Sequence, residues 1–144
     1  MKAKLLHEDQ GQKTFAVIFD IGDEVSQGLL TFAKDHNLSA SHFTAIGAFS
    51  EVTLGYFQWE KKEYKKIPVK EQVEVLSMAG DITLQDGEPK VHAHVVLGKS
   101  DGTAHGGHLI EARVRPTLEV IVVESPKHLQ RKYNPDVGFA AISL

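Results

Sequence analysis

The sequence predicts a single α+β domain, in which one main helix packs on a mostly antiparallel sheet of about eight strands. Three observations lead to this prediction. The 144 residues match the usual length of one domain. One segment has the apolar spacing of a helix, and from Ala40 onward short β-branched and aromatic runs alternate with turn residues. We expect one domain over residues 1–144, with a core of about 15–124 and a tail, 125–144, that packs back on it.

The N-terminal part predicts a strand followed by the main helix. The run Thr14–Asp20 is apolar, β-branched and aromatic, as strands are. Asp23 is the expected N-cap of a helix over about Glu24–His36, and Asn37 suits its end because Asn tolerates the left-handed conformation. Four apolar residues at positions i, i+4, i+7 and i+8 form one stripe along this helix: Val25, Leu29, Phe32 and Ala33.

The rest of the chain predicts strands almost throughout. Seven further strands are expected, over His42–Ile46, Glu51–Trp59, Glu71–Met78, Asp81–Leu84, His92–Leu97, Gly106–Val114 and Thr117–Glu124. Asp86-Gly87 is a turn signal, and the continuous apolar run Val120–Val123 suggests burial on both faces of the sheet. Pro126 and Pro135 interrupt the last twenty residues, so the tail is expected to hold a short turn of helix.

Composition excludes several classes of function. The chain has no cysteine, which rules out disulfides, cysteine-based zinc or iron–sulfur sites and thiol catalysis. No apolar run has the length of a membrane span, and the N-terminus turns acidic too soon for a signal peptide, so we expect a cytoplasmic protein. The net charge of −3 argues against strong direct binding of nucleic acid. The four lysines of Glu60–Lys66 are expected on a solvated hairpin tip or edge strand.

Histidines are the unusual feature, since four of the eight lie between His92 and His108. Side chains alternate along a strand, so His92 and His94 share one face, about 7 Å apart along the strand. The segment Gly106–Ala112 is expected to return as the antiparallel partner strand, and its register decides which later histidine joins the pair.

Two registers are open. With a three-residue loop, Ser100–Gly102, the residue numbers of any two paired residues add up to 202. This register sets His94 opposite His108 and places His105 on the other face. With a two-residue turn at Asp101-Gly102 these numbers add up to 203, which sets Val95 opposite His108 instead. The Asp-Gly dipeptide favours the two-residue turn, so only an odd-residue loop or a bulge assembles a cluster.

Three imidazoles with a fourth position left to water are the ligand set of an open zinc site. The candidate metal ligands are therefore His92, His94 and His108, while the alternative is the polar face of a half-exposed sheet. The glycines before His108 would allow close approach of backbone or ligand. The remaining histidines have no partner by pattern and are expected at the surface or in satisfied positions: His7, His36, His42 and His128.

Four motifs occur in an order that resembles the PPC domain, also called DUF296, which plants and prokaryotes share. They are Gly47–Gly55, Val75–Gly80, His92–Val95 and Gly106–Leu109. The resemblance implies an α+β fold with a strongly curved antiparallel sheet, a homotrimer, and one zinc or other divalent transition metal per subunit at His92, His94 and His108. His105 matches no characteristic position. Plant relatives carry AT-hook motifs, which suggests a DNA-associated regulator, but Arg113–Pro116 lacks the glycine of an AT-hook.

A more distant resemblance keeps an enzyme in view. The order His-x-His, hairpin, Gly-Gly-His is similar to the zinc-binding hairpin of acetolactate decarboxylases. It implies an alternative function, a metal-dependent lyase or hydrolase acting on a small oxoacid-like metabolite. The carboxylates nearest the motifs are Glu51, Glu111 and Glu119, and the nearest cations are Arg113 and Arg115. No catalytic residue can be assigned from these patterns.

Overall fold

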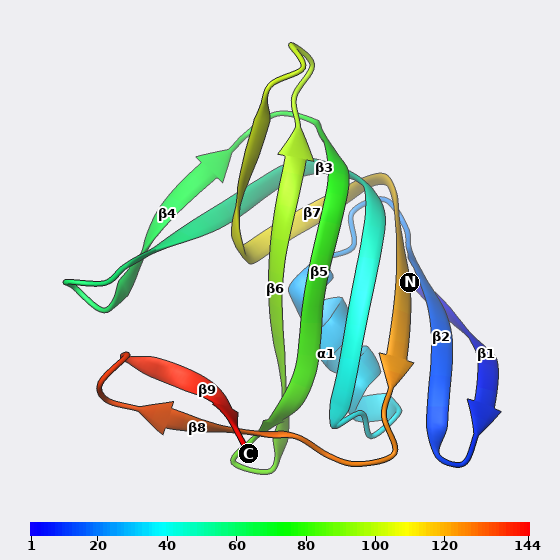
Figure 1. Cartoon of the computed structure of the whole chain (residues 1–144). Coiled ribbons are helices and arrows are strands. Elements are labelled where there is room, and N and C mark those ends of the chain that lie inside the picture. Colours follow the sequence, from blue (N-terminus) through cyan, green and yellow to red (C-terminus); the bar gives the residue numbers. More distant parts are fainter.

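The computed structural model describes all 144 residues as one nine-stranded sheet and one helix. In chain order the elements are β1 (Lys2–Asp9), β2 (Gln12–Phe19), α1 (Val25–Asp35), β3 (Ala40–Gln58), β4 (Glu63–Val69), β5 (Val73–Gln85), β6 (Glu88–Gly98), β7 (Ala104–Glu124), β8 (Gln130–Asn134) and β9 (Phe139–Ser143) (Figure 1). The single α+β domain predicted from the sequence is confirmed.

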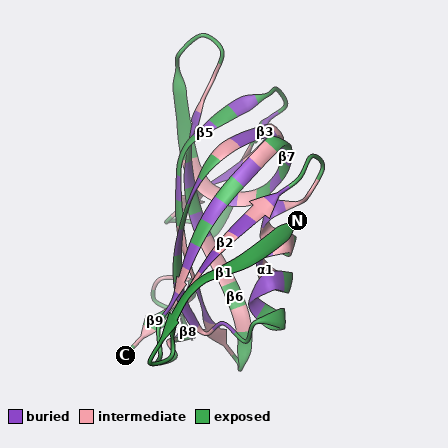
Figure 2. Cartoon of the chain, turned by 90° about the vertical axis from the view of Figure 1, so that its right-hand side faces the viewer, coloured by how far each residue is buried: buried purple, intermediate pink, exposed green.

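The sheet curves until it closes on itself. Strand β3 pairs with β5 and β7, and β6 pairs with the same two strands, so these four form a complete circuit. Breaks in the β3–β7 register, such as the one between Thr53 and Leu54, let the two long strands bend. The core is a cluster of 27 buried residues, and the apolar face of α1 packs into it (Figure 2). The helix is too short and too polar to cross a membrane.

The helix begins and ends almost where the sequence predicts, but its N-cap differs. Glu24, not Asp23, accepts the free amides of Ser26 at 3.2 Å and Gln27 at 2.6 Å. Asp23 pairs instead with the N-terminal ammonium of Met1 at 2.8 Å. The Glu24 carboxylate is long enough to reach the helix and β7 together, since it also accepts from the amide of Ala112. All four residues of the predicted apolar stripe are buried, as expected.

Three pairs of predicted strands are single long strands. Strand β3 runs through Gly47, which the sequence suggested as a break. Gly47 has φ +149°, and a Cβ there would collide with the carbonyl oxygen of Thr117, so this glycine allows two backbones to approach within a continuous, bent strand. Strand β5 and strand β7 likewise merge segments that were expected to be separate.

The two ends of the chain differ most from expectation. Strand β1 is fully exposed and pairs only with β2, and its mixed polar sequence gave no strand signal. The short helical turn predicted after residue 125 is wrong, because β8 and β9 form a hairpin there. That hairpin attaches to the sheet through a short parallel pairing of Leu84 with Gln130.

The side chains of the apolar run Val120–Val123 in β7 point alternately into the core and to the outer face. The prediction that this run is buried on both faces of the sheet is therefore wrong. Val120 and Val122 lie in the core, whereas Ile121 remains 43% exposed on the outer face of the sheet. Ile46 is exposed on the neighbouring strand, so the outer face carries apolar side chains that this chain alone leaves uncovered.

Candidate metal centre

The hairpin between β6 and β7 has a three-residue loop. The amide of Lys99 donates to the carbonyl of Thr103 at 2.9 Å, and the amide of Gly102 donates to the carbonyl of Lys99 at 2.9 Å. Gly102 takes φ +81°, as the left-handed residue of such a loop does. The carboxylate of Asp101 accepts from the amide and the hydroxyl of Thr103, which stabilises this form of the turn.

An identical dipeptide forms the other kind of turn elsewhere in the chain. Asp86 and Gly87 have φ +53° and +84°, and they join the paired residues Gln85 and Glu88 by a two-residue turn. Asp101 is not among the positive-φ residues. The two-residue turn considered for Asp101-Gly102 is therefore wrong.

The observed register is the one that assembles the histidines. His94 lies opposite His108, and His105 lies opposite Leu97 on the other face. Gly107 lets the backbones of β7 and β3 approach closely, since a Cβ at this position would lie 2.8 Å from the carbonyl oxygen of Gly55. Of the two registers that the sequence left open, the structure has the odd-residue one, on which the three-histidine cluster depends.

The three imidazoles converge on one point. One nitrogen from each of His92, His94 and His108 lies within 4.8 Å of the other two, and the Nε2 atoms of His92 and His94 are 3.2 Å apart. Two nitrogens that share a tetrahedral ion at 2.0–2.1 Å are separated by about 3.3 Å. In addition, Nδ1 of His108 is buried and has no hydrogen-bond partner in the chain. The cluster therefore fits a metal ion and needs a partner that the protein does not supply.

The surroundings favour the neutral form of two of the three imidazoles, those of His92 and His108. Burial lowers the pKa of His108 to about 4, and the neighbouring positive charges, His92 first, act in the same direction. Burial and the nearby Arg131 also lower the pKa of His92, against the opposing effect of Asp81. Neutral imidazoles are the form that binds metals, so at neutral pH no proton has to be removed from either ring.

Two residues that the sequence analysis did not single out lie beside His92. Nε2 of His92 faces His94, and Nδ1 lies 3.9 Å from Oδ2 of Asp81, which is too long for a hydrogen bond. Arg131 donates to that carboxylate at 2.7 Å and lies 3.1 Å from Nδ1 of His92. The two-residue turn at Asp86-Gly87 pairs Gln85 with Glu88, and counting back along both strands from this pair places Asp81 opposite His92. No local signal points to Arg131, which comes from the C-terminal hairpin.

An aromatic ring completes the wall of the cluster. Tyr64 of β4 stacks on His108 with ring centroids 4.6 Å apart and an angle of 25°. Beside them a hollow of about 600 Å³ opens along His92 and His108. The segment Glu60–Lys66 is an exposed turn and an edge strand, as predicted, but the stacking of Tyr64 was not foreseen.

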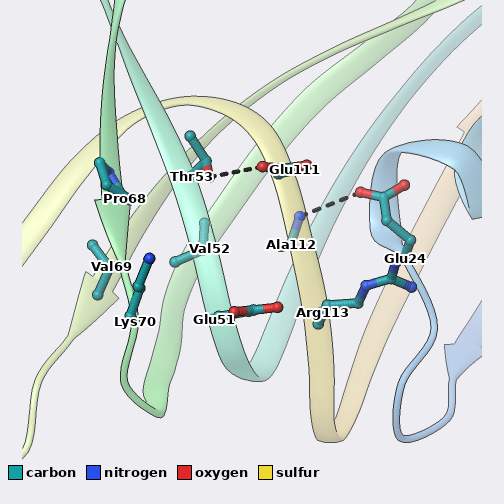
Figure 3. A pocket seen from close by; sticks show the side chains of 10 residues that line it. All are labelled: Glu24, Glu51, Val52, Thr53, Pro68, Val69, Lys70, Glu111, Ala112 and Arg113. Carbon is teal, nitrogen blue, oxygen red and sulfur yellow. Dashed lines mark hydrogen bonds between the residues drawn. The ribbon is translucent and has the colours of Figure 1, made fainter.

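The charged residues considered for catalysis do not join the histidines. Glu51, Glu111 and Arg113 line a different hollow of about 240 Å³ between β3, β4 and β7 (Figure 3). There Glu111 accepts from Thr53, and Glu24 from the amide of Ala112.

The other candidate charges have local roles or face solvent. Arg115 donates to Gln72 at 3.1 Å, and Glu119 is exposed on the outer face. The buried carboxylate of Glu124 is structural, because it accepts from the amides of Ser39 and Ala40 and from the hydroxyl of Ser41. The four histidines expected to stand apart are all exposed: His7, His36, His42 and His128.

Comparison with solved structures supports the fold and the family. A protein from Archaeoglobus fulgidus, described as metal-containing, is 34% identical, covers 92% of this chain and 94% of its own, and superposes with a TM-score of 0.85. A plant- and prokaryote-conserved (PPC) protein from Pyrococcus horikoshii is 33% identical over 99% of this chain and 95% of its own, with a TM-score of 0.86. A protein from Bacteroides thetaiotaomicron, described as a candidate DNA-binding protein, is 26% identical over 98% and 96%, with a TM-score of 0.87.

Two weaker matches have limited meaning. A Staphylococcus aureus protein described as similar to alpha-acetolactate decarboxylase is 12% identical over 80% of this chain and 53% of its own, with a TM-score of 0.58, which shows a shared fold alone. The bifunctional protein GlmU of a Synechococcus strain is 26% identical over 126 residues. This chain spans only 19% of that protein's length.

The family model of the Plants and Prokaryotes Conserved domain, abbreviated PCC or PPC, matches residues 6–126. That span contains the four strands of the closed circuit, the helix and all three clustered histidines. This chain therefore belongs to the PPC-domain family.

Proposed function

We propose that this protein binds one divalent transition metal ion per subunit, with zinc as the leading candidate, through His92, His94 and His108. The observation that carries the proposal is the convergence of three imidazoles on one point, with an unpartnered buried nitrogen among them. The description of the Archaeoglobus fulgidus relative as metal-containing supports it. Imidazole also suits nickel, copper and cobalt, so the donor set alone does not select zinc. An ion with an open position acts as a Lewis acid on ligand oxygens.

Metal analysis of the untagged protein tests this proposal. We expect close to one equivalent of metal per chain, and replacing any one of His92, His94 or His108 by alanine should weaken zinc binding by well over tenfold, since two imidazoles make a poor open site. The His105→Ala variant is the matched control, because His105 lies in the same hairpin on the other face. Zinc affinity that is equal in all four variants would exclude the site.

A second candidate function is a metal-dependent lyase or hydrolase acting on a small oxoacid-like metabolite. The observation that favours it is the hollow beside His92 and His108, which gives a ligand access to the cluster. Asp81 is the carboxylate beside the cluster that could act as an acid or base, but both of its oxygens accept hydrogen bonds from Arg131. A thermal-shift screen of small metabolites on the metal-loaded protein, followed by product analysis of each hit, separates the two functions. Hits that bind without turnover would support binding alone.

Assembly and partners belong to the same proposal. We infer a cytoplasmic homotrimer from the family resemblance and from the uncovered apolar side chains of the outer face, such as Ile46 and Ile121. The description of the Bacteroides relative favours a DNA-associated role. The net charge of −3 argues against it, since DNA is itself strongly negative. We expect duplex DNA binding to be weak, which a salt titration of binding would check.

A further inference from the structure

The hollow beside the histidines has walls from separate parts of the chain. Strands β6 and β7 supply His92 and His108, the edge strand β4 supplies Tyr64 and Lys66, and the β8–β9 hairpin supplies Tyr133. Figure 1 shows the β3–β4 and β8–β9 hairpins projecting to the same side of β6. Lys62 donates to the carbonyl of Pro135 at 2.5 Å, which ties the tips of the two hairpins together. At about 600 Å³ the hollow has the size of a small-molecule site, roughly 300–1,000 Å³.

The charge of the hollow is opposite to that of the whole chain. Lys66, Lys90 and Arg131 line it, and no aspartate or glutamate does, although the chain carries a net charge of −3. Neither Lys66 nor Lys90 forms an ion pair, in contrast to Lys34 and Lys99, which each bind a glutamate. Two unpaired ammonium groups at the mouth of a hollow without acids attract an anion.

Arg131 gives the hollow a fixed hydrogen-bond donor, and Asp81 balances its charge. Its side chain is only 7% exposed, and its Nε donates to Thr83 at 2.9 Å. One terminal nitrogen, Nη2, is engaged by Asp81 and His92, and the other, Nη1, donates to the carbonyl of Ala140 at 3.1 Å. A guanidinium has five N–H groups, so one on Nη1 has no partner in the chain. A buried, oriented donor of this kind suits a carboxylate oxygen.

Aromatic side chains form the remaining wall. Tyr64, Tyr133 and Phe139 line the hollow, and Tyr64 is held in place by stacking on His108. Phe57 packs edge-on against Tyr64 and Phe139, with ring centroids 5.3 and 5.4 Å away, and so links the two hairpins. Flat, supported rings favour a ligand with a flat apolar body, because offset stacking contributes beyond the area it buries.

We propose that this hollow binds a small planar organic anion, a carboxylate on an aromatic or conjugated body, with the carboxylate directed to Lys66, Lys90 and Arg131 and the flat body against the aromatic wall. The inference rests on the proposed function in that two of the three proposed metal ligands, His92 and His108, line the same hollow. The charged and aromatic residues do not depend on the ion, so the two can be tested separately.

Benzoate and benzamide are suitable probes, since they share a shape and differ in charge. Calorimetric titration of the zinc-loaded protein at low ionic strength should show benzoate binding at least tenfold tighter than benzamide. The double variant Lys66→Gln, Lys90→Gln should lose about tenfold in benzoate affinity and little in benzamide affinity. Lys61→Gln is the matched control, because Lys61 is an exposed lysine of the neighbouring turn that does not line the hollow.

The same titrations on chelator-treated protein distinguish the two proposals. If no zinc binds but benzoate still depends on Lys66 and Lys90, the metal proposal fails and the anion site stands. If zinc binds with full stoichiometry but benzoate and benzamide bind equally, or the double variant matches the Lys61→Gln control, the anion site is wrong. An affinity for benzoate below detection in both forms would also overturn it.

Discussion

Burial sets the protonation state of the histidine cluster at the scale of single residues. His108 is enclosed by Tyr64 on one side and the other two histidines on the other, and its pKa falls to about 4 from an ordinary 6.5. A ring in this environment resists protonation, because a charge there would lose solvation and face neighbouring positive groups. The neutral form of His108, which suits a metal ligand, is thus kept at the cost of stability in acid.

This cost gives a pH prediction for the metal-free protein. Between about pH 6.5 and 4 the unfolded chain binds a proton at His108 that the folded chain does not, so the free energy of unfolding should fall as pH is lowered through that window. Above pH 6.5 both states are neutral at this residue and the contribution is constant. Chemical denaturation of chelator-treated protein at pH 7.5, 6.5 and 5.5 measures the slope.

The variant His108→Gln is the control for that slope. It cannot titrate, so its stability should decline less between pH 7.5 and 5.5 than that of the parent protein, whatever its absolute stability. Carboxylates elsewhere titrate in both proteins and cancel in the comparison. Identical slopes would mean that the ring is not protected from protonation in the folded state.

At the scale of elements, the register of the β6–β7 hairpin decides whether a site exists. Side chains alternate along each strand, so shifting the register by one residue moves His108 away from the face that His92 and His94 share. The loop Ser100–Gly102 has the required odd number of residues, and Asp101 stabilises it through Thr103. The convergence of the three histidines is therefore specified as much by this turn as by their positions in the sequence.

Deleting Ala104 tests this dependence without touching a ligand. The deletion keeps the three-residue loop and moves every later residue of β7 one place along the strand, so Val95 should face His108 and zinc affinity should fall by more than tenfold. Deleting Ser100 is the control, because the two-residue loop that remains still joins Lys99 to Thr103 and leaves the strand register as it is. Cooperative thermal unfolding of both variants would show that the fold is retained. Equal zinc affinity in the two variants would mean that the strand register does not control the site.

On the scale of the whole molecule, one helix cannot cover both faces of the sheet. The helix packs on the core side, where Val120 and Val122 lie, and the outer face leaves Ile46 and Ile121 exposed in a single chain. Apolar groups gathered on one face of a protein mark an interaction surface. The inferred homotrimer would cover this face with copies of the same chain.

Light scattering measures the predicted assembly directly. The parent protein should have the mass of three chains at micromolar concentration, and Ile121→Glu should shift it towards the 15.9 kDa monomer, since a buried charge without a partner is costly. Lys2→Glu on the exposed strand β1 is a control that should stay trimeric. A parent protein that is already a monomer would exclude the trimer.

The sequence by itself determined the fold class, the helix with its buried stripe, and the short list of clustered histidines. These features arise from local patterns, because hydrophobic periodicity and turn residues act over a few neighbours. The pairing of Asp81 with His92 follows only once the turn at Asp86-Gly87 is known to have two residues.

Only the tertiary structure decided the choice between the two registers at Asp101-Gly102, because the same dipeptide forms a different turn at Asp86-Gly87. It also decided what surrounds the histidines. Tyr64 and Arg131 reach the cluster from an edge strand and from the C-terminal hairpin, 28 and 39 positions from His92 in the sequence. No local pattern encodes such contacts, since they depend on how the closed sheet brings distant segments together.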